Sequence, residues 1–205
     1  MINLQGFKNL EGLKAGKQKN LQGFGNLEGL VKGETQMNFE QGELFHLYNR
    51  ANSQDEIIFH ERENYLYFLK QYRKYLEKYF DTICYCLIPN HFHFLVKVKE
   101  LDENLQGFKN LEGLNIKIIQ SISNFLNSYA KAFNKKYKRR GSLFQKRTKS
   151  KHIDQEKYLQ RIVRYIHRNP LKHKLITNLE DWEFSSYPDY IGQRNGSLPE
   201  KNIVL

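Results

Sequence analysis

The segment that most restricts the fold of this chain is HFHFLVKVK at 91–99, which follows the turn residues Pro89 and Asn90. Successive side chains of a β-strand point to opposite faces of the sheet. One face of this strand carries only apolar side chains, those of Phe92, Phe94, Val96 and Val98. We predict that this face lies in the core, so that His91 and His93 stand together on the opposite side.

Hydrophobic periodicity supplies the other elements of an α+β domain. Strands are predicted at 44–48, 82–88 and roughly 143–148; helices are predicted at 61–79, at 116–137, and from a cap at Asp154 to a stop at Pro170. The order β-α-β-β-α-β, followed by a helix, is typical of the ferredoxin-like plan, an antiparallel sheet with helices on one face. The tail from about residue 178, which includes WEFSSYPDY, is interpreted as a packing segment.

An eleven-residue repeat interrupts this pattern. NLQGFKNLEGL at 3–13 returns as NLQGFGNLEGL at 20–30 and as NLQGFKNLEGL at 104–114. Its irregular spacing argues against a solenoid, and each copy has too few apolar side chains to fold alone. We predict that 1–36 is an added extension that need not be ordered, and that the domain spans 37–205 with an inserted loop at 101–115. Deleting 1–36 and 104–114 is expected to leave stability nearly unchanged.

The charge balance favours a polyanionic partner. Lysine and arginine total 33 against 22 acidic residues, a net charge of +11, which makes DNA or RNA the default candidate, although charge alone is a weak signal. Cys84 and Cys86 are too few for a zinc site and are expected to be buried, reduced thiols. Because no segment has the length and apolarity of a membrane span or signal peptide, we expect a soluble cytoplasmic protein.

The paired histidines are candidate metal ligands. Two neutral imidazoles on one face of a strand can hold a single divalent ion. For a bare His-x-His pattern, however, ordinary polar surface residues are the more common explanation.

A tyrosine in the last helix, within RIVRYIHRNP, adds a second chemical group. Tyr165 and Asn169 are four residues apart and so share a helical face. A tyrosine oxygen can attack phosphorus when the phosphate is polarised. The amide oxygen of Asn169 could complete a three-ligand metal site with His91 and His93, leaving open positions for the phosphate. Taken alone, Tyr165 would more often be a core aromatic residue.

Together these segments resemble a known family. PNHFHFLVKV is similar to the His-hydrophobic-His motif of HUH endonucleases, and YIHRNPLKHKL followed by WEFSSY resembles the C-terminal signature of single-tyrosine transposases. The resemblance is greatest to transposases associated with repetitive extragenic palindromes, and it covers about 37–192.

The resemblance implies a ferredoxin-like fold with Tyr165 as nucleophile and His91 and His93 as ligands of Mg²⁺ or Mn²⁺. It implies Asn169 as third ligand, where many relatives use glutamine. The implied activity is cleavage of single-stranded DNA near hairpins, giving a 5′-phosphotyrosine link and a free 3′-hydroxyl. The stored ester energy allows the strand to be joined to another end, which is the chemistry of DNA transposition.

A DNA-binding surface is predicted from the stretch 131–151, which holds ten lysines and arginines and no acid. Basic groups neutralise phosphates, and exposed aromatic side chains can stack on unpaired bases. The alternative is a solvated helix end whose aromatics lie in the core. The residues we expect to contact DNA are Arg139, Arg140, Lys146, Arg147 and Lys149.

Two other functions remain open. One is a non-catalytic protein, derived from a transposase, that binds DNA hairpins. The other is a metal-dependent ribonuclease, although RNA cleavage can use the 2′-hydroxyl and needs no protein nucleophile. The intact set of His91, His93 and Tyr165 favours the enzyme that cuts single-stranded or hairpin DNA, working as a monomer or homodimer. In that case the two histidines should face Tyr165 across a polar cleft.

Overall fold

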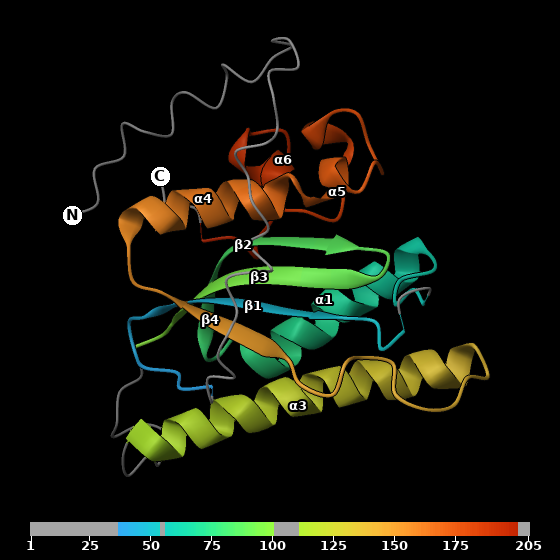
Figure 1. Cartoon of the computed structure of the whole chain (residues 1–205), viewed down its shortest axis with the longest axis horizontal. Coiled ribbons are helices and arrows are strands. Elements are labelled where there is room, and N and C mark those ends of the chain that lie inside the picture. The colour runs from blue at the N-terminus through green and yellow to red at the C-terminus, as the bar shows by residue number, and fades with distance from the viewer. Residues whose placement is uncertain (1–36, 54–55, 101–110, 201–205) are drawn as a thin grey trace. The chain divides into compact units, whose positions relative to one another are not determined.

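The strands form one antiparallel sheet in the computed structural model, which describes residues 37–53, 56–100 and 111–200 (Figure 1). They are β1 (Leu44–Arg50), β2 (Phe80–Ile88), β3 (His91–Val98) and β4 (Lys149–Ile153). Their order across the sheet is β2-β3-β1-β4, and every neighbouring pair is antiparallel. Helix α1 (Arg62–Leu76) connects β1 to β2, and α3 (Leu111–Lys136) leads from β3 toward β4. The predicted ferredoxin-like plan is confirmed.

Helices α1 and α3 cover one face of the sheet, which lies between them and α4 in Figure 1. Phe94 of β3 stacks on Tyr72 of α1, with ring centroids 4.1 Å apart. Phe92 packs against Phe68 of α1 at 5.1 Å, and Phe68 packs against Phe125 of α3 at 4.7 Å. Fully burying one such ring stabilises the fold by about 1.5–3 kcal/mol. The predicted core face of β3 is therefore confirmed.

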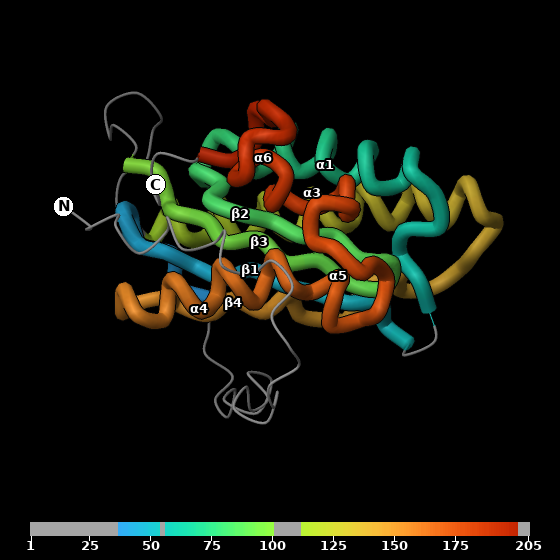
Figure 2. Tube along the Cα trace, turned by 90° about the horizontal axis from the view of Figure 1, so that it is seen from above, coloured from blue at the N-terminus to red at the C-terminus, as the bar shows by residue number. Residues whose placement is uncertain are grey.

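The other face of the sheet carries α4 (Glu156–His167) and the short helix α5 (Asn169–Lys172), as both views show (Figures 1 and 2). The apolar side chains of α4 recur at helical spacing and are all buried; they are Leu159, Ile162, Val163 and Ile166. This helix contacts β2, β3 and β4. It therefore lies over the sheet face to which His91 and His93 belong.

Strand β4 and helix α4 begin at different residues from those predicted from the sequence. The strand lies at 149–153 rather than 143–148; Leu143 and Phe144 are buried outside it, and only an isolated bridge joins Phe144 to Ala51. Regular pairing with β1 begins only at Lys149. Helix α4 has Gln155, not Asp154, at its N-cap position, without a capping hydrogen bond from the side chain.

The segment predicted as an inserted loop at 101–115 is partly helical. Residues 1–36 and 101–110 lie outside the described residues, but the last part of the third copy, 111–114, forms the first turn of α3. Leu114 is only 1% exposed and belongs to the core. The neighbouring Asn115 accepts a hydrogen bond from the backbone N–H of Phe39 at 3.0 Å and donates one to the carbonyl of Met37 at 3.2 Å. The structure therefore leads us to expect that deletion through Leu114 lowers stability, contrary to the prediction from the sequence.

The C-terminal segment packs along β2, as predicted. It contains the 3₁₀ turn η5 (Leu179–Asp181) and the helix α6 (Tyr187–Tyr190). Trp182 donates its indole N–H to the carbonyl of Leu87 at 2.9 Å, and the hydroxyl of Ser186 accepts the N–H of Tyr85 at 2.9 Å. Phe184 stacks on Tyr65 of α1 at 3.8 Å. These contacts hold the chain after α5 against the edge of the sheet.

The two cysteines are as expected from their spacing. Cys84 and Cys86 are both buried on β2, and neither forms a disulfide. Burial raises the pKa of both thiols, which keeps them protonated. Among the described residues, no helix is both long enough and apolar enough to cross a membrane.

Candidate active site

The two histidines of β3 are placed by the register of the sheet. His93 lies opposite Tyr48 of β1 and Cys86 of β2, and His91 lies opposite Arg50 and Ile88 at the end of the sheet. The His93 side chain is 5% exposed, whereas His91 is half-buried. Their ring centroids are 5.0 Å apart. The alternation of the strand thus brings both imidazoles to the side covered by α4 and α5.

The side chain of Asn169 joins the two imidazoles. Its Oδ1 lies 2.9 Å from Nε2 of His91, and its Nδ2 lies 3.2 Å from Nε2 of His93. Asn169 is fully buried. It begins α5, because α4 ends at His167, so Tyr165 and Asn169 do not share one continuous helix as the sequence spacing assumed. The three side chains predicted as ligands are nevertheless brought together.

The other ring nitrogens of both histidines also have partners. Nδ1 of His93 lies 2.9 Å from Nε2 of His46, a buried side chain of β1. Nδ1 of His91 lies 2.7 Å from Oδ1 of Asn90. These contacts orient the rings so that both Nε2 atoms point to Asn169. An outer partner of this kind is a general feature of histidine ligands to metals.

Burial keeps these imidazoles neutral at physiological pH. It lowers the pKa of His46 to about 3 and the pKa of His91 to about 4, with the nearby His173 adding to the effect on His91. The pKa of His93 is also held well below its usual value, first by burial and then by its histidine neighbours. A neutral imidazole offers a lone pair at one ring nitrogen, which is the form that binds a metal.

The donor set fits a divalent cation. A neutral His91 can donate only one proton, yet each of its ring nitrogens faces an amide oxygen, one of Asn90 and one of Asn169. Turning over either asparagine amide would satisfy His91 within the protein, and a cation between Nε2 of His91 and Oδ1 of Asn169 would satisfy it as well. Among the described residues, no group of three histidine, cysteine, aspartate or glutamate side chains is placed to hold a metal. That Asn169 supplies a third ligand remains a prediction, and its amide oxygen lies 2.9 Å from Nε2 of His91.

Tyr165 of α4 lies beside the histidines. Its half-buried ring meets the ring of His93 edge-on, with centroids 5.4 Å apart and an angle of 78° between the planes. The ring of His46 lies 6.3 Å away, and Nζ of Lys172 is 5.5 Å from the centroid of Tyr165. Tyr165 therefore lies beside His93, as predicted, although the two rings pack directly against each other rather than across a cleft.

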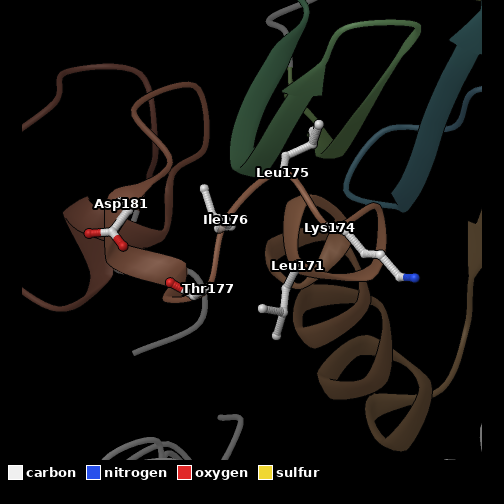
Figure 3. Close-up of a pocket in the computed structure, with 6 residues that line it drawn as sticks. All are labelled: Leu171, Lys174, Leu175, Ile176, Thr177 and Asp181. Carbon is white, nitrogen blue, oxygen red and sulfur yellow. The ribbon is translucent and has the colours of Figure 1, made fainter.

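A separate depression lies beside α5 and the segment that follows it. It is lined by Leu171, Lys174, Leu175, Ile176, Thr177 and Asp181 (Figure 3). None of the residues predicted for the site contributes to it. The candidate active site is thus the packed surface between β3 and α4, not this depression.

The basic residues predicted to contact DNA have unequal surroundings. Arg139 forms an ion pair with Glu56 and donates to the carbonyl of Ser142 at 2.9 Å, so its guanidinium holds the end of α3 to neighbouring loops. The other four side chains are exposed; they are Arg140, Lys146, Arg147 and Lys149. That these residues bind DNA remains a prediction.

Sequence reasoning missed three residues of the site. His46 and Tyr48 were seen only as part of a strand, and His173 was left without a role. The rings of His46 and Tyr48 stack at 4.7 Å, and His173 lies 5.0 Å from His91. The alternation of LFHLY could have placed His46 and Tyr48 on the face opposite Phe45 and Leu47. It could not have shown that this face adjoins His93, which depends on the pairing of β1 with β3.

Comparison with known proteins gives one curated relative and one solved structure. The relative, described as “Putative REP-associated tyrosine transposase” from Haemophilus influenzae, is 30% identical over 125 residues, which are 58% of this chain and 66% of the relative, just under two thirds of its length. The solved structure is of a REP-associated tyrosine transposase bound to a REP hairpin. It matches with a TM-score of 0.54 and 18% identity, over 77% of this chain and 84% of that chain. No protein-family model matches. These findings confirm the resemblance that the motifs indicated.

Proposed function

We propose that this relative of the REP-associated tyrosine transposases is a metal-dependent enzyme that cleaves and rejoins single-stranded DNA beside hairpins. The observation that carries the proposal is the convergence of four side chains on one side of the sheet. Nε2 of His91 and Nε2 of His93 both face the amide of Asn169, and the ring of Tyr165 lies edge-on to His93. A nucleophile next to a set of metal donors is an arrangement suited to phosphoryl transfer.

His91, His93 and Asn169 would hold the metal, with Mg²⁺ or Mn²⁺ as the proposed ion. Two imidazole nitrogens and one amide oxygen form a mixed donor set, and amide oxygens and water suit both of these ions. When bound, such a metal would polarise the scissile phosphate and stabilise charge on the leaving oxygen. His46 and Asn90 would keep the two imidazoles oriented toward it.

Tyr165 would act as the nucleophile. Its phenolic oxygen would form a bond to the scissile phosphorus while the bond from phosphorus to the 3′-oxygen breaks. The phenol proton passes to solvent water, and the departing 3′-oxygen takes a proton from solvent to become a free hydroxyl. The product is a 5′-phosphotyrosine, and attack on it by another 3′-hydroxyl would rejoin the strand and release Tyr165.

The proposed DNA partner is supported by charge and by the relatives. The chain has a net charge of +11, and the solved structure with the same fold contains a REP hairpin. Exposed cations next to the site, such as Lys149 and Lys172, could neutralise phosphates of a strand that reaches Tyr165.

The test is incubation of the protein with a single-stranded DNA that contains a hairpin, in the presence of Mn²⁺ or Mg²⁺, followed by a denaturing gel. We expect a covalent protein–DNA adduct that Tyr165→Phe and chelation of the metal each abolish. Tyr165→Phe should still bind the hairpin, because the ring and its packing remain. Binding by the native protein without any cleavage would favour a non-catalytic hairpin-binding protein. Cleavage of RNA but not DNA, without an adduct, would favour the ribonuclease.

A further inference from the structure

Three tyrosines around the site each lie under a lysine from another element. The pairs, with the distance from Nζ to the ring centroid, are Lys149 with Tyr48 at 5.8 Å, Lys151 with Tyr158 at 4.6 Å, and Lys172 with Tyr165 at 5.5 Å. Elsewhere in the described residues, such pairs join only chain neighbours: Lys74 with Tyr75, Lys78 with Tyr79, and Lys136 with Tyr137. Tertiary structure, not proximity in sequence, therefore creates the three pairs at the site.

The sheet register places the lysines of β4 on the same face as the site. Lys149 lies opposite Tyr48 and Lys151 lies opposite His46, the residue that contacts His93. Helix α4 contacts β4 and runs beside it in Figure 2. The edge of the sheet at β4 and the neighbouring edge of α4 thus form one continuous border that ends at Tyr165.

Tyr158 lies on the part of this border that is farther from the active site than Tyr165. It precedes Tyr165 by seven residues, so both tyrosines lie on the same side of α4, about 10 Å apart along its axis. That separation equals about three nucleotides at the spacing of about 3.4 Å per stacked base. Tyr158 is half-buried, which fixes its ring, and Lys151 lies over it.

The lysines beside the site differ in their surroundings from several cations elsewhere in the domain. Four cations on or near α1 and α3 are paired with carboxylates: Arg62 with Glu183, Arg73 with Glu77, Lys136 with Glu61 and Arg139 with Glu56. Within the part of the chain that the structure describes, Lys149, Lys151 and Lys172 form no ion pair. Arg161 and Arg164 add positive charge on the exposed side of α4, and Asp154 and Glu156 are the acids at its beginning. Cations without an internal counterion are available to an external polyanion.

We propose that the border between α4 and β4 binds the unpaired DNA strand that continues from the scissile phosphate. Tyr158 stacks on a base about three nucleotides from Tyr165. Lys149 and Lys151 contact the phosphates of that strand. The inference rests on the proposed function, since it takes Tyr165 as the point of attack.

Alternating aromatic and basic side chains suit a single strand better than a duplex. A tyrosine ring can stack on any unpaired base, because every base has a free π-face once it leaves the double helix. Lysine contacts a phosphate as a point charge and carries no sequence preference. The border between α4 and β4 should therefore fix the position of the strand, whereas the base sequence of the strand is recognised elsewhere on the protein.

Equilibrium binding of labelled DNA by fluorescence anisotropy tests the proposal. The probes are a blunt hairpin and the same hairpin with an unpaired extension of about six nucleotides on its 5′ or its 3′ side. Tyr158→Ala should raise the Kd for one of the extended hairpins roughly 5- to 100-fold and leave the Kd for the blunt hairpin unchanged. Tyr158→Phe should restore binding, because the ring remains. Tyr67→Ala, an exposed tyrosine of α1 on the other face of the sheet, is the matched control and should have no effect.

The lysines are tested through salt dependence. Lys149→Ala and Lys151→Ala should each lower the slope of log Kd against log salt by about 1 for the extended hairpin, whereas Lys74→Ala on α1 should not. Thermal unfolding of each variant checks that it is folded.

The outcomes separate this inference from the proposed function. If the native protein forms the covalent adduct but Tyr158→Ala binds both probes like the native protein, the border between α4 and β4 does not bind the strand and the proposed function stands. An equal rise of the Kd for blunt and extended hairpins in Tyr158→Ala would also contradict strand binding at this border. If the native protein binds none of the probes, both proposals fail.

Discussion

Replacing His46 by alanine tests whether this buried residue positions the site. Nε2 of His46 lies 2.9 Å from Nδ1 of His93, and both side chains are 5% exposed. The variant would leave Nδ1 of His93 buried without its partner, which costs about 1–3 kcal/mol, and the cavity adds to this cost. We therefore expect the free energy of unfolding to fall by about 2–4 kcal/mol.

A purely structural role of His46 would affect only stability, so metal binding must be measured as well. Loss of the contact that orients a histidine ligand typically weakens metal binding about 10- to 100-fold. Calorimetric titration with Mn²⁺ should show this loss for His46→Ala and partial recovery for His46→Gln, whose amide can reach Nδ1 of His93. His152→Ala, an exposed histidine of β4, is the matched control and should bind Mn²⁺ normally. Normal Mn²⁺ affinity in a folded His46→Ala protein would refute the positioning role.

Three further predictions concern stability. Because burial lowers the pKa of His46 and His167 to about 3, the unfolded chain binds more protons than the folded one below about pH 6.5, so stability should fall with acid. Urea unfolding should show a loss of about 2 kcal/mol per histidine between pH 7.5 and pH 5, and a flat profile would contradict the burial argument. Leu114→Ala should lower the free energy of unfolding by about 2–5 kcal/mol, since the side chain lies in the core. An unchanged urea midpoint would instead support an inserted loop at 111–114. Arg139→Ala removes the ion pair with Glu56 and should lower the free energy of unfolding by about 1–3 kcal/mol. Replacing the exposed Arg140 by alanine should lower it by less than about 0.5 kcal/mol. Equal urea midpoints for the two variants would show that the ion pair does not stabilise the fold.

The central sheet could be predicted because its signal is local. The alternation of β3 determines which side chains enter the core, and it restricts the register with β1 and β2 to pairings that keep those side chains on one face. The last strand was misplaced because KSKHI at 149–153 has only one strongly apolar side chain, Ile153. Pairing with the edge of β1 defines that strand, whereas Leu143 and Phe144, at the start of the predicted segment 143–148, are buried outside the regular pairing.

The repeat illustrates the opposite case, in which flanking sequence changes the structure of a short segment. The letters LEGL end every copy, but in the third copy they precede the helical pattern of 116–137. Extending an existing helix by a turn is far easier than starting a new one. That is why Leu111 begins α3 and Leu114 reaches the core.

The site was partly predictable for the same reason. His91, His93, Tyr165 and Asn169 lie in motifs with recognisable spacing, although the break between α4 and α5 was not foreseen. His46 becomes visible only when β1 is placed beside β3, because its partner is 47 positions away in the chain.

Identification of the residue that carries the DNA is the most direct test of the central claim. The native protein should be incubated with hairpin-containing single-stranded DNA and Mn²⁺, then digested with nuclease and protease and analysed by mass spectrometry. We predict a nucleotide phosphate on the peptide that contains Tyr165, with none on the Tyr158 peptide. A modified Tyr158, or cleaved DNA without any modified peptide, would contradict the assignment of Tyr165 as the nucleophile.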